Sequence, residues 1–392
     1  MKWIEEELDR LKEGDQERKL KPFTAVFGCP GYGKREGKPL LHLSSNDYLG
    51  LSQHPSIIEA MNEALVMEGA GSGSSRLVAG NRAIFKTLED ELAVWQRTEA
   101  ALVFSNGYMA NSGLIPALVG RNDVVFSDRL NHASMVDGIV LSRAEYIRYR
   151  HNDMEHLKYL LARHRDRRRK LIVTDAVFSM DGDRAPLEQL VLLKRDYGAM
   201  LMVDEAHSGG VYGEKGEGLA HCLGLHQEID IHMGTFSKAF GIYGAYVCGN
   251  ETLIRWLINK AKPLIYSTAL PPSVIAGIYK SLELVQSGQG RRHKLFALAE
   301  LFRTKLAEAG FQVGRGDSPI VPIMAGDNGL ALQFADALEA EGILAVAIRP
   351  PTVPDGTARI RFSLTAAHTE QELTDAADRI IRVGRHLGVL TS

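Results

Sequence analysis

The sequence predicts an α/β protein with a mostly parallel central sheet flanked by helices, and a smaller α+β domain at its C-terminal end. Two observations carry this prediction. Between residues 84 and 247, short apolar runs alternate with helical segments at the spacing of βα units. After residue 247 the pattern changes to long helices followed by scattered strands. We expect an N-terminal segment of residues 1–55, a large α/β domain of residues 56–286 and a small domain of residues 287–392.

The composition indicates an ordinary globular protein. Of the 392 residues, 45% are apolar and 24% are charged, with a net charge of −2. This near-neutral balance gives no reason to expect a nucleic acid or an anionic membrane as partner. The three cysteines form no CxxC pair, so we expect no metal site. With a charged N-terminus that lacks a signal-like apolar core, we expect a cytoplasmic protein.

The first hundred residues contain the expected N-terminal elements and one ambiguous loop. Residues 3–12 form an amphipathic pattern, residues 40–43 read as a strand, and Pro55 opens a helix that extends to residue 67. Residues 69–80 are rich in glycine and serine but fit neither GxGxxG nor a P-loop. This loop suits a connector as well as it suits a ligand loop.

The βα array follows in order. Turns after its strands carry the polar side chains, and the turn at residues 105–108 leads into a helix whose first N–H groups can bind an anion. The expected helices of the array span residues 84–96 and 109–119, and its strands span residues 101–104, 124–126, 171–174, 199–203, 229–233 and 245–247. A basic run at residues 163–170 reads as a solvated helix end. The C-terminal part is expected to contain strands at residues 320–324, 344–348 and 359–364.

Two neighbouring strands of this array end in chemically useful groups. Asp204 follows the buried run 199–203, and the run 229–233 leads to Thr235 and Lys238. Ligands of open α/β sheets bind beyond the carboxyl ends of the strands. A carboxylate, hydroxyls and a lysine at that edge suit a cofactor with a basic ring nitrogen, a phosphate and an aldehyde.

Each of these residues also has an ordinary structural explanation. Asp204 could cap a turn, Lys238 could extend into solvent from a helix start, and His132 and His207 could be hydrogen-bonded structural histidines. Their coincidence after strands of one array favours a site. Small and apolar neighbours disfavour the charged form of a lysine, which makes Lys238 a candidate Schiff-base nucleophile.

Several motifs resemble one enzyme family. DEAH at residues 204–207 and GTFSKAFG at 234–241 resemble fold-type I pyridoxal-phosphate enzymes. SNDYLG at 45–50, NHAS at 131–134 and FSMDG at 178–182 narrow the resemblance to the α-oxoamine synthases. The resemblance implies pyridoxal 5'-phosphate as cofactor and a condensation of an amino acid with an acyl thioester that releases CO2. AIRPPTVP at 347–354 resembles the family member that joins alanine to a pimeloyl thioester in biotin biosynthesis.

The resemblance also implies roles for individual residues. Lys238 would bond to the cofactor aldehyde and later act as the general base, and Asp204 would pair with the ring nitrogen. His132 would stack on the ring, and His207 would reach its phenolic oxygen. The other cofactor-binding residues implied are Gly107, Tyr108, Ser179, Thr235, Ser237, Ser267 and Thr268. The substrate-binding residues implied are Arg18, Asn46, His132, Arg349 and Thr352, with Arg349 on the substrate carboxylate and Arg18 and Thr352 facing the acyl chain.

The resemblance further implies a homodimer with shared active sites, because residues 266–268 match a segment that reaches the partner's phosphate. The chain departs from the family pattern at Gly209, Phe236 and Ala245, where relatives usually carry Thr, Leu and Gly.

Three alternatives remain open. The same chemistry on glycine would give 2-amino-3-oxobutyrate or 5-aminolevulinate. A non-catalytic pyridoxal-phosphate-binding regulator would normally carry a DNA-binding extension, and a dinucleotide oxidoreductase would need the missing GxGxxG. The acyl carrier, coenzyme A or a carrier protein, is also left open by the sequence.

Overall fold

The computed structural model describes residues 1–314 and 316–390 and divides into two compact units. Unit 1 comprises Met1–Gln53, Ser179–Asp183 and His293–Ser392. Unit 2 comprises His54–Phe178 and Arg184–Arg292.

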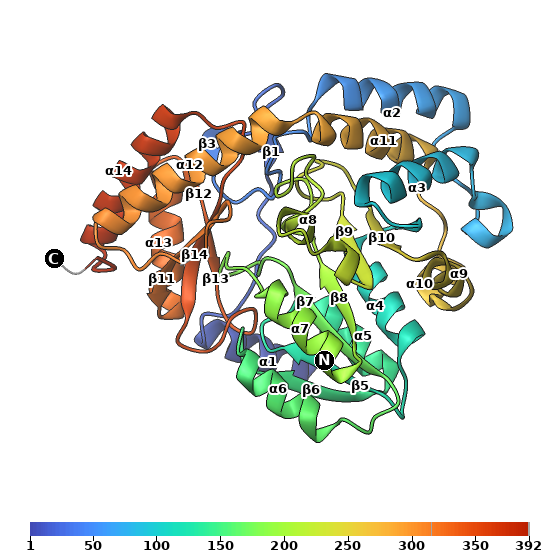
Figure 1. Ribbon diagram of the computed structural model, residues 1–392. Coiled ribbons are helices and arrows are strands. Elements are labelled where there is room, and N and C mark those ends of the chain that lie inside the picture. The colour runs from blue at the N-terminus through green and yellow to red at the C-terminus, as the bar shows by residue number, and fades with distance from the viewer. Residues whose placement is uncertain (315, 391–392) are drawn as a thin grey trace. The chain divides into compact units, whose positions relative to one another are not determined.

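Unit 2 is built on a seven-stranded sheet in the order β4-β10-β9-β8-β7-β5-β6 (Figure 1). Only β10 runs antiparallel to its neighbours, β4 and β9, and all the other pairs are parallel. The predicted mostly parallel sheet is therefore confirmed. The strands are β4 (Ala100–Phe104), β5 (Val124–Asp128), β6 (Glu145–Tyr149), β7 (Lys170–Asp175), β8 (Met200–Asp204), β9 (Ile231–Thr235) and β10 (Ala245–Gly249).

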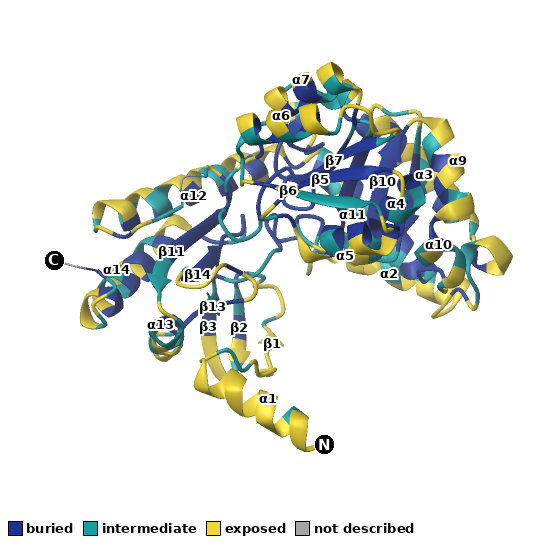
Figure 2. Ribbon diagram, turned by 90° about the horizontal axis from the view of Figure 1, so that it is seen from below, coloured by how far each residue is buried: buried dark blue, intermediate teal, exposed yellow. Residues whose placement is uncertain are grey.

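The sheet of unit 2 is buried on both faces, as a parallel sheet requires. Alternate residues such as Val173 and Met202 join one apolar cluster with Leu114 of α4 and Ile139 of α5. Their strand neighbours, such as Val203, are buried on the opposite face. In Figure 2 the central strands of this sheet are accordingly dark blue, whereas β6 at its edge is teal.

Helices connect the strands of unit 2, and side-chain caps fix where several of them begin. Asn106, Asp153 and Asn250 each accept a hydrogen bond from a backbone N–H in the first turn of the following helix. The helices are α2 (Pro55–Glu68), α3 (Ala83–Gln96), α4 (Gly107–Leu118), α5 (Ala133–Ser142), α6 (Met154–Arg163), α7 (Leu187–Tyr197), α8 (Leu219–Cys222), α9 (Glu251–Lys260), α10 (Lys262–Tyr266) and α11 (Pro272–Gln286).

In unit 2 the structure adds detail to the glycine-rich loop and corrects the expectation for the basic run. The glycine-rich loop contains a π-helical turn, Arg76–Gly80, which closes so tightly that a Cβ on Gly80 would lie 2.1 Å from the carbonyl oxygen of Ser74. The basic run is not a solvated helix end throughout. Lys170 is buried at the start of β7, and its ammonium donates to the carbonyl oxygens of Arg165 and Arg167.

Among its described residues, unit 1 contains two small sheets and four helices. One sheet has the order β1-β2-β3-β12 and the other the order β11-β14-β13. The expected strand at residues 344–348 is split, because β12 pairs with β3 whereas β13 pairs with β14. The elements are β1 (Thr24–Ala25), β2 (Tyr32–Arg35), β3 (Lys38–His42), β11 (Ile320–Gly326), β12 (Ile343–Leu344), β13 (Val346–Ile348), β14 (Ala358–Ser363), α1 (Lys2–Glu13), α12 (Gln289–Glu308, in this unit from His293), α13 (Asn328–Ala340) and α14 (Glu370–His386).

The terminal helices of unit 1 differ in how they are held. Thr369 and Glu372 form a capping box at the start of α14, and one face of that helix is buried. The amphipathic α1 has no buried residue and is coloured mostly as exposed in Figure 2. Its Trp3 is 68% exposed. In the described part of the chain, no helix is both long and apolar enough to cross a membrane.

Candidate active site

The candidate site of unit 2 lies at the carboxyl ends of its parallel strands. β7 ends at Asp175, β8 at Asp204 and β9 at Thr235, and all three side chains are buried. The register places Asp175 directly opposite Asp204. Polar groups that are buried at one sheet edge need partners, and here they find them in one another and in the loops that follow.

Lys238 and His207 meet in this cluster. The Lys238 Nζ lies 2.9 Å from His207 Nε2. Lys238 is half-buried, whereas His207 is almost fully buried in the turn that follows β8. The sequence thus predicted correctly that these two residues come together, although they lie 31 positions apart.

Asp204 is 3% exposed, and hydrogen bonds hold both of its carboxylate oxygens. Oδ1 accepts from the backbone N–H of Ala206 at 2.9 Å, and Oδ2 accepts from the Asn111 amide at 2.8 Å. Donors of this kind stabilise a buried carboxylate.

His132 caps the start of α5. Its backbone N–H donates to Asp175 Oδ2 at 2.9 Å, and its Nδ1 lies 2.7 Å from Ser134 Oγ. Partial desolvation lowers the pKa of His132. The negative charge of Asp204 opposes this shift, and the positive charge of Lys238 adds to it.

A cradle for an anion lies at the start of α4. A Cβ on Gly107 would lie 3.4 Å from Met233 Cε and 3.8 Å from Thr235 Cβ, so the first turn of the helix approaches the end of β9 closely. The Thr235 hydroxyl donates to the carbonyl of Gly244 and accepts from the N–H of Ser237. Unpaired N–H groups at a helix start bind phosphate, and Lys238 follows three residues after Thr235. These groups together fit the phosphate and the aldehyde of pyridoxal phosphate.

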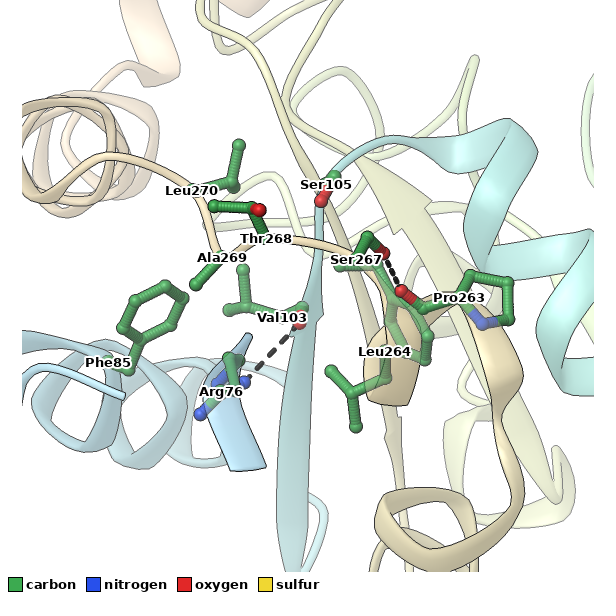
Figure 3. Close-up of a pocket in the computed structure, with 11 residues that line it drawn as sticks. Arg76, Phe85, Val103, Ser105, Pro263, Leu264, Ser267, Thr268, Ala269 and Leu270 are labelled. Carbon is green, nitrogen blue, oxygen red and sulfur yellow. Dashed lines mark hydrogen bonds between the residues drawn. The ribbon is translucent and has the colours of Figure 1, made fainter. Parts of the chain in front are cut away.

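The remaining predicted cofactor residues of unit 2 lie around this cradle or at its margin. Tyr108 is half-exposed, and its hydroxyl donates to Asp137. Ser267 and Thr268 line a small cavity of about 10 Å³ with Ser105, two positions before Gly107 (Figure 3). Such a cavity has room for about one water molecule, so a phosphate would need the groups of a second chain or a movement of this segment.

In unit 1, the predicted residues Asn46 and Ser179 both accept hydrogen bonds from Arg361, which the sequence analysis did not identify as a site residue. Arg361 is 7% exposed, and its guanidinium donates to the carbonyl of Ser179, to Asn46 Oδ1 and to the Ser363 hydroxyl. The same guanidinium also hydrogen-bonds to the Tyr48 side chain, so at most one of its five N–H donors is left for a carboxylate. The signal was available, since arginines that alternate with apolar residues in a strand, as in β14, require partners when they are buried.

The other predicted substrate-binding residues of unit 1, Arg18, Arg349 and Thr352, also cluster. Arg18 donates to the Thr352 hydroxyl at 3.0 Å. Arg349 donates to the carbonyl oxygens of Asp15 and Glu17. Burial lowers the pKa of Arg349, and the neighbouring charge of Arg18 lowers it further.

Three family departures form a single structural environment. Phe236 packs against the ring of Tyr246, which is the neighbour of Ala245 in β10. The Tyr246 hydroxyl is buried without a hydrogen-bond partner among the described residues, and a Cβ on Gly209 would lie 3.0 Å from it. A threonine at position 209 would supply the missing partner at the cost of tighter packing.

Sequence reasoning missed three further residues of the unit 2 cluster. Asn111, Ser134 and Asp175 are buried and contact predicted site residues. Asp175 ends an apolar strand in the way Asp204 does, and Asn111 stands in an apolar helix one turn after Gly107. A polar residue in such apolar surroundings indicates a buried polar group, so both residues could have been proposed as site residues from the sequence.

Comparisons with known proteins agree with this geometry. The family model for aminotransferase class I and II matches residues 38–380. The chain is 54% identical to a putative 8-amino-7-oxononanoate synthase of Geobacillus kaustophilus, over 97% of this chain and 98% of the relative. It is 50% identical to the 8-amino-7-oxononanoate synthase of Geobacter sulfurreducens, over 98% of each chain.

Solved structures lead to the same family. A serine palmitoyltransferase from S. paucimobilis with bound pyridoxal phosphate and myriocin superposes with a TM-score of 0.93 at 33% identity, over 99% of this chain and 98% of that chain. The 8-amino-7-oxononanoate synthase of Francisella tularensis superposes with a TM-score of 0.78 at 29% identity, over 88% and 98%. The chain therefore belongs to the aminotransferase class I and II family and, within it, to the 8-amino-7-oxononanoate synthases, which are acyltransferases that depend on pyridoxal phosphate.

Proposed function

We propose that this enzyme joins L-alanine to a pimeloyl thioester, with loss of CO2, to give 8-amino-7-oxononanoate and a free thiol in biotin biosynthesis. The names of relatives at 50% and 54% identity support this substrate pair. The serine palmitoyltransferase resembles the chain closely in fold but is only 33% identical, so serine and a palmitoyl thioester are the less favoured pair.

The observation that carries the acyl assignment is the arginine pair of unit 1. Arg18 and Arg349 are close enough for one charge to lower the pKa of the other, and their hydrogen bonds go to neutral oxygens. Two adjacent guanidinium groups favour an anionic ligand. A pimeloyl thioester has a free carboxylate at its far end, whereas acetyl and palmitoyl thioesters have none.

The residues of unit 2 account for the chemical steps. Pyridoxal phosphate supplies an electron sink for the carbanion formed at Cα. The Lys238 amine takes the Cα proton and later returns one, and His207, at 2.9 Å, orients that amine. The Asp204 carboxylate keeps the proton on the ring nitrogen, because a nearby negative charge favours the protonated form. His132, at the start of α5, would stack on the ring of the bound cofactor.

Binding roles follow from charge. The N-terminus of α4 would hold the phosphate, and Thr235 would reach it by turning its hydroxyl away from the carbonyl of Gly244. In unit 1, Arg361 and Asn46 suit the carboxylate of the amino acid, because hydrogen bonds to Ser179, Asn46 and Ser363 fix the positively charged guanidinium.

A substrate matrix tests the proposal. The purified enzyme, loaded with pyridoxal phosphate, is mixed with alanine, glycine or serine and with the pimeloyl, succinyl, acetyl or palmitoyl ester of coenzyme A. Release of CO2 and thiol is measured, and the product is identified by mass spectrometry. We expect alanine with pimeloyl-coenzyme A to give the highest kcat/KM. A higher value for glycine with succinyl or acetyl, or for serine with palmitoyl, would overturn the assignment. Repeating the best pair with an acyl carrier protein identifies the preferred carrier.

A further inference from the structure

A fully buried amide links two residues of the candidate site. Asn111 is 0% exposed and stands in the apolar helix α4. A buried amide is costly unless it is hydrogen-bonded. Its Nδ2 group donates one hydrogen to Asp204 Oδ2 at 2.8 Å and the other to Ser134 Oγ at 2.9 Å.

The position of this amide is tightly constrained. A Cβ on Gly138 of α5 would lie 2.7 Å from the backbone oxygen of Asn111, so α4 and α5 pack there without an intervening side chain. The orientation of the amide is also fixed, because the reverse one would aim its carbonyl oxygen at the Asp204 carboxylate.

The direction of the hydrogen bonds determines where the proton of His132 lies. Ser134 Oγ accepts from Asn111, so its own hydrogen is directed to His132 Nδ1 at 2.7 Å. The backbone N–H of Ser134 points to the same ring nitrogen at 3.2 Å. With two donors aimed at it, Nδ1 is unprotonated, and the imidazole carries its proton on Nε2.

The electrostatic surroundings agree with a neutral ring. Partial desolvation lowers the pKa of His132, Asp204 opposes the shift and Lys238 reinforces it. Asp175, which accepts the backbone N–H of His132, has a pKa raised well above its usual value by burial and by the nearby Asp204. The disfavoured charge of Asp175 gives little support to a positively charged imidazolium.

We propose that Asn111 is a positioning residue that holds the Asp204 carboxylate in place and, through Ser134, keeps His132 as the neutral Nε2–H tautomer. The inference rests on the proposed function only in giving Asp204 and His132 roles at the cofactor. One amide thereby sets the geometry of one group and the protonation of the other.

Two pairs of variants separate the hydrogen bond from Asn111 to Asp204 from the path that leads through Ser134 to His132. Ser134→Ala removes the hydroxyl between Asn111 and His132 but leaves the bond from Asn111 to Asp204. Ser134→Thr keeps the hydroxyl and is the conservative rescue. Asn111→Asp has nearly the same shape but loses both donors and places a second carboxyl group beside Asp204. Ser112→Ala, which removes an α4 hydroxyl that donates to the carbonyl of Met109 at 3.4 Å, is the matched control.

The first measurement is the tautomer of His132 by ring ¹⁵N NMR on apo protein, with the signal assigned from its loss in His132→Asn. We expect the Nε2–H form in the wild type, in Ser134→Thr and in Ser112→Ala, and a tautomer mixture in Ser134→Ala and Asn111→Asp. The second measurement is pyridoxal-phosphate affinity, which we expect to weaken tenfold or more in Asn111→Asp but less than threefold in Ser134→Ala.

A wild-type tautomer in Ser134→Ala, or wild-type cofactor affinity in Asn111→Asp, would overturn the inference. If Asn111→Asp does not fold, the Ser134 pair still decides the tautomer. Neither measurement involves a substrate, so a wrong substrate assignment would leave both results unchanged.

Discussion

Replacing Arg349 by methionine should separate acyl substrates with a terminal carboxylate from those without one. The guanidinium is half-buried, and two of its donors are held by the carbonyl oxygens of Asp15 and Glu17. It therefore offers its remaining donors in a fixed place to the free carboxylate of a pimeloyl chain.

The magnitude follows from the kind of bond that is lost. A hydrogen bond between charged groups contributes about 1.5–3 kcal/mol. Because Arg18 is adjacent and the site is partly open to solvent, we take the lower end, about 1.5 kcal/mol. Each 1.4 kcal/mol corresponds to about tenfold, so KM for the pimeloyl thioester should rise roughly tenfold at nearly unchanged kcat.

The assay compares pimeloyl-coenzyme A with its methyl ester, which lacks the terminal charge. The wild type should prefer the acid, and Arg349→Met should lose most of that preference. Lys19→Met is the matched control. Lys19 is an exposed cation of the N-terminal segment that Arg349 contacts, and its ammonium lies 3.4 Å from the Glu17 carboxylate. Equal losses for the acid and the ester would refute the argument and would assign Arg349 to holding the N-terminal segment instead.

Four further outcomes are expected. Lys238→Ala should lose both the absorbance of the covalently bound cofactor and all turnover, so turnover in this variant would exclude Lys238 as the attachment site. Asp175→Asn should keep kcat within a few-fold of wild type, because burial and the nearby Asp204 raise the pKa of Asp175 and so disfavour its charged form, and a loss as large as that of Asp204→Asn would contradict this. A chain with Ser267 and Thr268 both changed to alanine should regain activity when mixed with Lys238→Ala chains if the sites are shared in a dimer; sedimentation and activity of the mixture test this. Burial lowers the pKa of His232 from 6.5 to about 4, so this neutral histidine should remove about 3 kcal/mol of stability as the pH falls from 6.5 to 4, and urea unfolding of His232→Gln should show a shallower pH dependence.

The sequence predicted those site residues that lie next to the ends of strands. Asp204 and Lys238 follow apolar runs directly, and parallel topology places the ends of such runs at one edge. The position of Lys238 and His207 at one edge of the sheet could therefore be predicted from sequence. Their contact at 2.9 Å is a finding of the structure.

The parts that could not be predicted depend on packing between distant segments. Arg361 lies in a strand of the C-terminal part, and nothing local indicates that its partners are Asn46 and Ser179, 315 and 182 positions away. The division of the strand at residues 344–348 has a similar cause. Its first part, β12, pairs with β3 of one sheet, and its second part, β13, pairs with β14 of the other. Local patterning gives the existence of a strand but not its partner.

Three aspartates at neighbouring strand ends show how environment assigns different roles to the same residue type. Asp128 is bound by the His151 imidazole and by two backbone N–H groups, so its carboxylate is committed to contacts within the protein. Burial and the proximity of Asp204 raise the pKa of Asp175, which disfavours the charged form of this carboxyl group. Asp204 instead receives the neutral amide of Asn111 and one backbone N–H, donors that stabilise its negative charge without cancelling it. Two charged carboxylates on adjacent strands would repel each other, and the burial of Asp175 disfavours its charge. The hydrogen-bond donors around Asp204 therefore make it the better partner for a protonated ring nitrogen, so we expect that the roles of Asp204 and Asp175 cannot be exchanged.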